Sequence, residues 1–364
     1  MLKCLRGITG ILGPLAGLVS AVAVGLLFCT GLALLLDISP LELLSTIWEG
    51  AWGSPDSAAA SFAKVTPLLM AGLAVSMAYQ ANLLNIGCEG QLTLGALAAA
   101  SFSVAGSSLP AFLLMPLTLL AGVLAGGAWA FPPIWLRQRR GVHEVITTLL
   151  MNYVAIYVAE YLVLGPLGDG SAMGRTPPMP PAAVWQPLYM IGTIGITAAP
   201  FLAIFLSAIA QLWLSKTCWG YEVIAGGSNP AAARTSGIPV DAWQKRLFVL
   251  SGALAGLAGA LEVSAVHHRF YNSFSPGYGF DGITAAFLVN AAPGWLWLSS
   301  LLLASLRAAD KWLQLALGVS PNAILIIQAV MLVAVACQGR LHVLGRLLLA
   351  VLPGARRPEQ TGKT

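Results

Sequence analysis

The sequence predicts an all-α fold: a polytopic transmembrane helical bundle of about ten spans, with one or two discontinuous helices. Hydrophobic residues make up 57% of the 364 residues and charged residues only 9%, and the mean hydropathy is +0.80. Soluble domains carry about 25% charged residues. The apolar runs are continuous rather than alternating, which excludes a transmembrane β-barrel. The net charge of +5 is modest and lies mostly at the termini and in a few loops, so it sets membrane orientation and does not indicate nucleic-acid binding.

The first apolar run, residues 8–36, is predicted to be a retained membrane span. A cleavable signal core is about 7 to 15 residues long, and this run is nearly twice that length. Lys3 and Arg6 precede it, and positive flanks mark the cytoplasmic side, so the N-terminus is expected in the cytoplasm. Residues 37–61 hold acidic residues and no Lys or Arg, which indicates an external loop with an interfacial segment.

A polar stretch rather than a loop separates the second and third runs, residues 62–84 and 86–102. It supplies three candidate pathway residues, Asn85, Glu89 and Gln91. Polar groups at that depth must be paired or must line a wet path, and transporter binding sites are often built at broken helices. The alternative is a cytoplasmic-side turn in which the Glu89 carboxylate caps the next helix. The sequence leaves both interpretations open.

The fourth run, residues 110–136, ends in a cluster of arginines, which places that end in the cytoplasm. In the fifth run, residues 142–164, Glu144, Thr148 and Asn152 recur every fourth residue and therefore share one helix face. Such a stripe either lines a solute pathway or forms hydrogen bonds between helices. We assign Asn152 to the pathway, and we expect a structural or gating role for Glu144 near the cytoplasmic end.

Prolines recur through residues 165–187, so this segment is expected to be an external loop. It is either a contact for a substrate-delivering protein or a passive linker. The sixth run, residues 188–214, leads to the longest polar passage of the chain, residues 216–246, which is expected to be a cytoplasmic loop between two spans. Gly226 and Gly227 indicate a turn inside it.

A short, capped helix is predicted within that loop, and its shape suits contact with a partner. Asn229, or Ser228 before it, is a good N-cap, and Pro230 is a good first helical residue. Ala233 and Arg234 are strong helix formers. Gly237 then ends the helix.

The seventh run, residues 247–266, carries glycines at the spacing of closely packed membrane helices. Glu262 lies near its outer end and either faces the pathway or pairs with His267, His268 or Arg269. The two adjacent histidines have no third ligand at a useful spacing, so no metal site is predicted.

Residues 295–317 and 322–337 complete the apolar runs, and a basic tail follows them. We expect a single transmembrane domain over residues 1–353 and a basic tail over residues 354–364. Because basic flanks lie inside, both termini are expected in the cytoplasm.

Several of these motifs, in this order, resemble those of permease subunits in bacterial ABC importers of the ribose and nucleoside type. The nucleoside-type permeases are the nearest match, and the resemblance runs from about residue 47 to residue 339. The segment at residues 141–153 also matches, with His143 where the family has Asn. The other matching motifs are Asn85-Ile86-Gly87-x-Glu89-Gly90-Gln91, Gly227-x-Asn229-Pro230-x-Ala232-Ala233-Arg234-x-x-Gly237-Ile238 and Gly277-Tyr278-Gly279-Phe280-Asp281-Gly282-Ile283.

The resemblance implies that the capped helix sits in a cleft of a separate ATPase and transmits its motion to the spans. The residues expected to couple the permease to this ATPase are Gly227, Asn229, Pro230, Ala233, Arg234, Gly237 and Ile238.

The resemblance also implies that the motif at residues 277–283 opens a short, discontinuous helix. Tyr278 and Phe280 beside Asp281 suit stacking on a nucleobase and hydrogen bonding to a sugar, or they belong to an interfacial aromatic belt. The chain departs from the family pattern at residues 289–295, where we expect an altered substrate preference or altered gating.

The implied assembly lies in the bacterial inner membrane and imports nucleosides or related simple sugars. Besides this chain it contains a second, homologous permease, an ATPase subunit that binds ATP and Mg²⁺, and an external substrate-binding protein or lipoprotein. This chain has no phosphate-binding loop, so we expect it to carry no cofactor and not to be an enzyme.

Two other classes stay open on the sequence alone. One is an ion- or proton-coupled secondary transporter that uses Glu89, Glu144 or Glu262 as a relay. The other is an integral-membrane enzyme, for which no convergent reactive cluster is visible.

Overall fold

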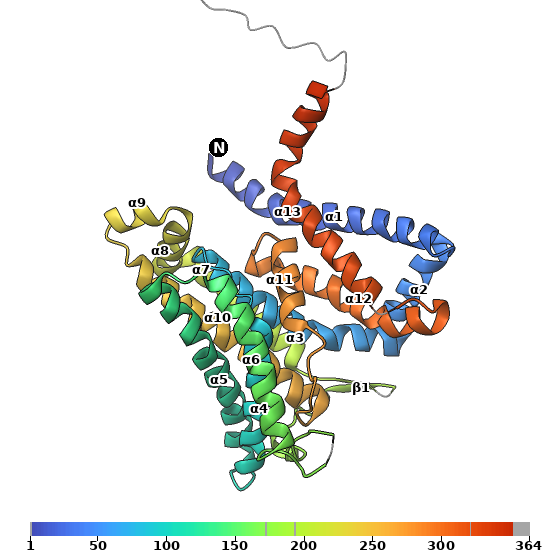
Figure 1. Cartoon of the computed structure of the whole chain (residues 1–364), viewed down its shortest axis with the longest axis vertical. Helices are drawn as coiled ribbons and strands as arrows, with labels where there is room; N and C mark the ends of the chain where they lie inside the picture. The colour runs from blue at the N-terminus through green and yellow to red at the C-terminus, as the bar shows by residue number, and fades with distance from the viewer. Residues whose placement is uncertain (1, 172, 193, 321, 352–364) are drawn as a thin grey trace, which may run out of the picture.

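The computed structural model describes residues 2–171, 173–192, 194–320 and 322–351, and nearly all of its regular structure is helical (Figure 1). The first half contains α1 (Leu2–Leu35), α2 (Pro40–Trp52), α3 (Pro55–Gln80), α4 (Cys88–Ala105), α5 (Ala111–Arg140), α6 (Glu144–Leu164) and a 3-10 turn (Pro181–Ala183). The second half contains β1 (Tyr189–Ile191), β2 (Ile194–Ile196), α7 (Ala199–Lys216), α8 (Cys218–Ser228), α9 (Pro230–Thr235), α10 (Val240–Glu262) with a π-helical turn (Val263–His267), α11 (Tyr278–Leu288), a 3-10 turn (Pro293–Trp295), α12 (Leu296–Leu317) and α13 (Asn322–Val351).

Glycines allow α4, α5 and α10 to touch backbone to backbone. A Cβ on Gly126 of α5 would meet the backbone of Gly252 and Gly256 in α10, and a Cβ on Gly95 of α4 would meet Gly256. Small residues permit this close approach between membrane helices. The prediction of a close-packing surface on α10 is therefore confirmed, and these three helices form the tightest part of the bundle.

Six of the described helices are long and apolar enough to cross a membrane, and α11 with α12 adds a seventh span if this pair, bent by 105°, is counted as one. The polytopic helical fold is therefore confirmed. This count is lower than the prediction of about ten spans, because some elements are not counted as separate spans. α4 starts with polar residues, α11 and α12 are two arms of one bent element, and the described apolar part of the last helix is short, Asn322–Cys337.

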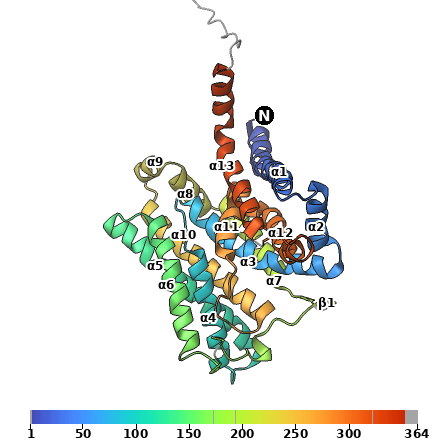
Figure 2. The ribbon, with the colours of Figure 1, turned by 45° about the vertical axis from the view of Figure 1, so that its right-hand side comes forward.

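The two ends of the bundle carry different structures (Figures 1 and 2). α8 and α9 lie at one end, where α5 also finishes with its arginines, and Gln138 Nε2 of α5 donates to the Asp241 carbonyl of α10 at 2.6 Å. The β1–β2 hairpin lies on the opposite side. α1 and α13 pack on each other, at the edge of the bundle away from α5 and α6.

Two sequence interpretations are corrected by the structure. Gly226 and Gly227 do not form a turn, since both lie in the last turn of α8. A Cβ on Gly227 would collide with the Gln80 carbonyl at the end of α3, so glycine there permits close packing of α8. The apolar run at residues 188–214 is not one span either, because its first part forms the hairpin, with Gly192 at φ +54° in the turn. The predicted basic tail, residues 354–364, lies outside the described residues.

Candidate functional site

A broken span brings polar groups into the interior of the bundle. α3 ends at Gln80, and Asn82 takes the left-handed conformation (φ 58°) that ends the helical path. Residues 83–87 then run without regular structure to the start of α4 at Cys88. Asn tolerates the left-handed region better than most residues. The break exposes backbone groups that need partners, because no water is available at that depth.

Asn85 and Gln91 supply part of this pairing. Asn85 Nδ2 donates to Gln91 Oε1 at 2.8 Å and to Ser251 Oγ of α10 at 2.9 Å. Asn85 Oδ1 accepts from Gly87 N at 2.9 Å and from Gln91 Nε2 at 3.3 Å. All three polar side chains are buried. The amides therefore fix the extended segment against α10.

Asn152 of α6 completes the pairing from the other side. Its Oδ1 accepts from Gly90 N at 2.9 Å and its Nδ2 donates to the Ile86 carbonyl at 2.8 Å. Glu144, Thr148 and Asn152 are 4%, 0% and 1% exposed, whereas Tyr153 beside them is 55% exposed. The predicted shared face of α6 is thus buried against the break. Thr148 donates within its own helix, to the Glu144 carbonyl at 2.8 Å.

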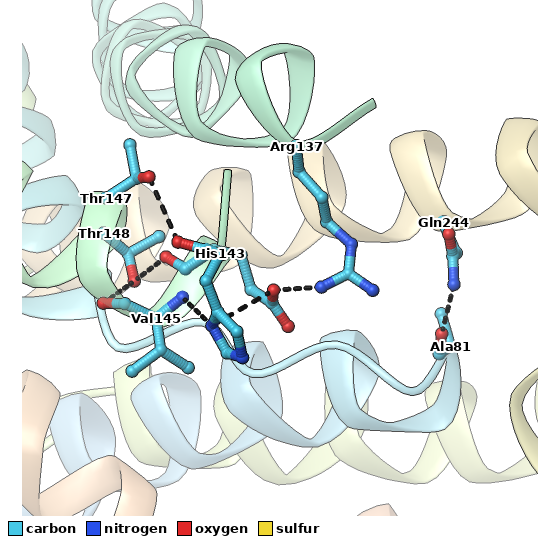
Figure 3. A network of polar contacts seen from close by, with 8 residues as sticks. Ala81, Arg137, His143, Val145, Thr147, Thr148 and Gln244 are labelled. Atoms are coloured by element: carbon cyan, nitrogen blue, oxygen red, sulfur yellow. Dashed lines mark hydrogen bonds and ion pairs between the residues drawn. The ribbon is translucent and has the colours of Figure 1, made fainter. Parts of the chain in front are cut away.

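Glu144 is held at the α8–α9 end of this face. It forms an ion pair with Arg137 of α5, and His143 Nδ1 lies 3.6 Å from the same Glu144 oxygen. Figure 3 shows Arg137 reaching from α5 toward the start of α6, and it also shows Gln244 Nε2 donating to the Ala81 carbonyl at 3.3 Å. Glu144 therefore joins two helices at their ends, which fits the structural role expected for it.

The discontinuous helix α11 meets the broken span at its own N-terminus. Glu89 Oε2 accepts from Gly279 N at 2.7 Å, in the first turn of α11. A carboxylate in this position is stabilised by the unpaired N–H groups and the helix dipole. Glu89 caps a helix, as the alternative interpretation held, but the capped helix is α11 and not α4.

An ion pair continues this chain of contacts into α12. Arg307 Nε lies 2.7 Å from Asp281 Oδ2, and the two side chains are 9% and 6% exposed. Arg307 Nη2 also donates to the Pro276 carbonyl at 3.2 Å, just before α11. We call Asn85, Glu89, Gln91, Asn152, Ser251, Asp281 and Arg307 the polar junction.

At one end of the molecule, α9 forms the capped helix that the sequence predicts. Asn229 Oδ1 accepts from Ala232 N at 3.1 Å. Gly237, at φ +82°, ends the helix, and Ile238 N donates a hydrogen bond to the Ala233 carbonyl at 3.0 Å. This left-handed glycine closure satisfies the last carbonyls of a helix. Arg234 Nη2 lies 2.7 Å from Asp241 Oδ1 and is more than half exposed.

Contacts join α8 and α9 to the polar junction. α8 touches the Gln80 carbonyl through Gly227, and α10 holds the next residue through Gln244. Trp243 Nε1 donates to Glu222 Oε2 at 2.7 Å, which ties α8 to α10. α8 and α10 therefore contact the residues where α3 breaks.

Comparison with known proteins identifies the class of molecule. Residues 57–336 match the family described as branched-chain amino acid transport system / permease component. The chain belongs to this family.

Relatives of the permease include named ABC transporter subunits. It is 34% identical over 329 residues to the glucose ABC transporter permease protein TsgB13 of Haloferax volcanii, covering 88% of this chain and 85% of that protein. It is 30% identical over 353 residues to the guanosine ABC transporter permease protein NupP of Bacillus subtilis, covering 94% and 98%. It is 26% identical over 295 residues to the nucleoside ABC transporter permease protein NupB of Lactococcus lactis, covering 79% and 81%.

This membership confirms the resemblance drawn from the motifs. The protein is a multi-pass membrane permease subunit of the ABC transporter type, and this decides against the secondary transporter.

The permease brings most of the predicted pathway residues together. Asn85 and Gln91 hydrogen-bond to each other, Asn152 binds the backbone between them at Ile86 and Gly90, and Glu89 reaches α11 near Asp281. Thr148 lies beside them, next to Gly87. Of the other predicted residues, Glu144 lies at the start of α6, Tyr278 is buried in the core, and Phe280 has 40% of its surface exposed. Whether any of them touches a solute stays a prediction.

Two members of the polar junction were not predicted. Ser251 is the one polar residue within the apolar stretch 247–261 of α10 and gives no periodic signal. Arg307 stands in a span that also holds Asp310 and Lys311, and a buried arginine in such a helix is itself a signal for a carboxylate partner. Asp281 is 26 residues away in the sequence, so the pair could not be assigned from spacing.

Proposed function

We propose that this permease forms part of the translocation path of an ATP-driven importer in a bacterial inner membrane, and that its solutes are nucleosides or simple sugars. The proteins named above are described as permeases for glucose, guanosine and nucleosides. These solutes share a sugar ring with several hydroxyl groups, and all are neutral. Nucleosides are the first candidate, because the motifs resemble nucleoside-type permeases.

The observation that carries this proposal is the continuous line of contacts from α9 to α12. It runs from the capped helix through Gln80 and Ala81 to the polar junction, and from Glu89 through Gly279 and Asp281 to Arg307. A motor that moves α8 and α9 would act through this line on both discontinuous elements of the bundle. Elements of this kind form the transport sites of other membrane carriers.

The proposal includes three partners for this permease. Arginine and lysine gather at the α8–α9 end, on Arg137, Arg139, Arg140, Lys216 and Arg234, so this end faces the cytoplasm. A separate ATPase, which binds ATP and Mg²⁺, grips α9 there. A second, homologous permease lies beside this one. The external substrate-binding protein docks at the opposite end, on residues 165–197.

Reconstitution tests the proposal. The permease, assembled with its ATPase and second permease in liposomes, is expected to accumulate radiolabelled guanosine or glucose when ATP and the binding protein are supplied. Uptake that stops when a proton gradient is collapsed, with ATP intact, contradicts an ATP-driven mechanism. Absence of uptake for both solutes contradicts the proposed substrate class.

Replacing Arg234 tests the coupling role. Arg234→Ala removes the exposed ion pair on α9 and is expected to lower uptake about tenfold, while ATP hydrolysis and membrane insertion persist, because a surface ion pair contributes only about 0–1 kcal/mol to stability. Thr235→Ala on the same helix is the control and should transport normally. Normal uptake by Arg234→Ala contradicts the assignment of α9.

A further inference from the structure

A cavity lies at the end of the molecule opposite α9, between the β1–β2 hairpin and the π-helical turn that follows α10. Its volume is about 380 Å³, within the range of small-molecule sites. The walls are formed by Trp185, Pro187, Met190, Thr197, Val266 and His268, among others. A narrow recess opens from the same residues, sharing Thr197 and Val266 with the cavity, and Glu262 lines that recess.

Two polar atoms at this place have no partner. Glu262 Oε2 and Trp185 Nε1 are buried and make no hydrogen bond within the part of the chain that the structure describes. The Glu262 residue is only 3% exposed, and its other oxygen, Oε1, lies 3.3 Å from His267 Nε2. A buried polar atom without a partner costs about 1–3 kcal/mol, so such atoms call for an explanation such as a ligand or a water.

The backbone around the cavity is firmly positioned. The π-helical turn exposes the Ser264 carbonyl, and Trp185 N donates to it at 3.1 Å. Met179 N donates to the His268 carbonyl at 2.9 Å. π-helical turns of this kind occur frequently at functional sites. The indole ring is thus held at the cavity, and the Glu262 carboxyl group is held at the adjoining recess.

The chemistry of the lining favours a neutral, polyhydroxylated ligand. The carboxyl oxygen accepts from a hydroxyl group, the indole N–H donates to one, and the flat indole ring stacks on a sugar face or a nucleobase. Burial lowers the pKa of His268, so its imidazole is neutral at pH 7 and offers one donor and one acceptor. The described lining holds no Lys or Arg that would select a phosphate or a carboxylate.

We infer that this outer cavity and its recess, with Trp185 in the cavity and Glu262 in the recess as polar contacts, are a binding site in the permease itself for the sugar moiety of the solute, occupied before the solute reaches the polar junction. The inference rests on the proposed function and adds to it a site on the external side. Nucleosides and hexoses share the ligand chemistry, and guanosine and glucose distinguish them.

Calorimetric titration tests the inference on the complete transporter in lipid nanodiscs, without binding protein or ATP. We expect wild-type complex to bind guanosine or glucose. Glu262→Gln and Trp185→Phe are each expected to raise Kd at least fivefold, since Gln removes the carboxylate, and Phe keeps an aromatic ring but removes the N–H and part of the indole. Glu49→Gln and Trp48→Phe change exposed residues that do not line the cavity or its recess, so they are the matched controls and should bind as wild type does.

The outcomes separate this inference from the proposed function. If both variants bind and transport as wild type does, the cavity holds water only and the inference is wrong, while the proposed function stands. If wild-type complex transports guanosine or glucose but binds neither in the titration, the inference is wrong as well. If wild-type complex transports neither solute, the proposed function fails first.

Discussion

The polar junction and the outer cavity both contain polar side chains in an apolar helical bundle, but they differ in how many of their polar atoms have a hydrogen-bond partner. At the junction, Asn85 makes four hydrogen bonds and Asn152 makes two. At the cavity, Glu262 Oε2 and Trp185 Nε1 have no partner among the described residues.

This difference separates two uses of polar groups in a membrane. Paired groups hold the backbone where a helix breaks, and replacing them destabilises the fold. Unpaired buried groups cost the unliganded fold free energy, so replacing them changes the binding of a ligand without the loss of stability expected at the junction. Stability measurements on each region therefore test the distinction directly.

The largest effect is expected from the ion pair at the end of the junction. Arg307→Met leaves Asp281 buried without its partner and is expected to cost about 3–5 kcal/mol. The measurement is the thermal unfolding midpoint of the detergent-solubilised protein, followed by size-exclusion chromatography. The double variant with Asp281→Asn removes both charges and should recover part of the loss. A normal midpoint for Arg307→Met would show that the pair does not stabilise the fold.

A smaller but still large effect is expected at Asn152. Asn152→Leu leaves the Gly90 N–H and the Ile86 carbonyl unpaired, and each unsatisfied group costs about 1–3 kcal/mol. The unfolding midpoint should fall clearly. Tyr153→Leu, one residue further along α6 and exposed, is the control and should leave the midpoint unchanged. Equal midpoints for the two variants would contradict a structural role for the junction.

The smallest effect is expected at the outer cavity. Trp185→Phe removes an N–H group that has no partner in the described structure and shortens a half-buried ring, so the unfolding midpoint should fall by less than that of Asn152→Leu. A drop as large as that of Asn152→Leu would mean that the indole N–H is structural, and the contrast between the two regions would disappear.

The sequence predicted local features well and long-range ones poorly. The cap at Asn229 and the stop at Gly237 depend on neighbouring residues, and both are confirmed. The shared face of Glu144, Thr148 and Asn152 follows from helical periodicity and is also confirmed.

The predictions that were wrong, and the contacts that could not be predicted, have a common physical origin. Gly226 and Gly227 looked like a turn because glycine permits unusual backbone angles, but here the missing Cβ serves the packing of α8 on Gln80. The link from Glu89 to Gly279 and the pair of Asp281 with Arg307 depend on how distant segments meet. The spacing of residues along one sequence does not show which distant segments come into contact.

The glycine contacts between α4, α5 and α10 have a mechanical consequence. Where backbones touch, no side chain can rearrange to let one helix slide or tilt against the other, so we expect these three helices to move as one rigid unit. Relative movement in a transport cycle is then expected at the borders of this unit rather than inside it.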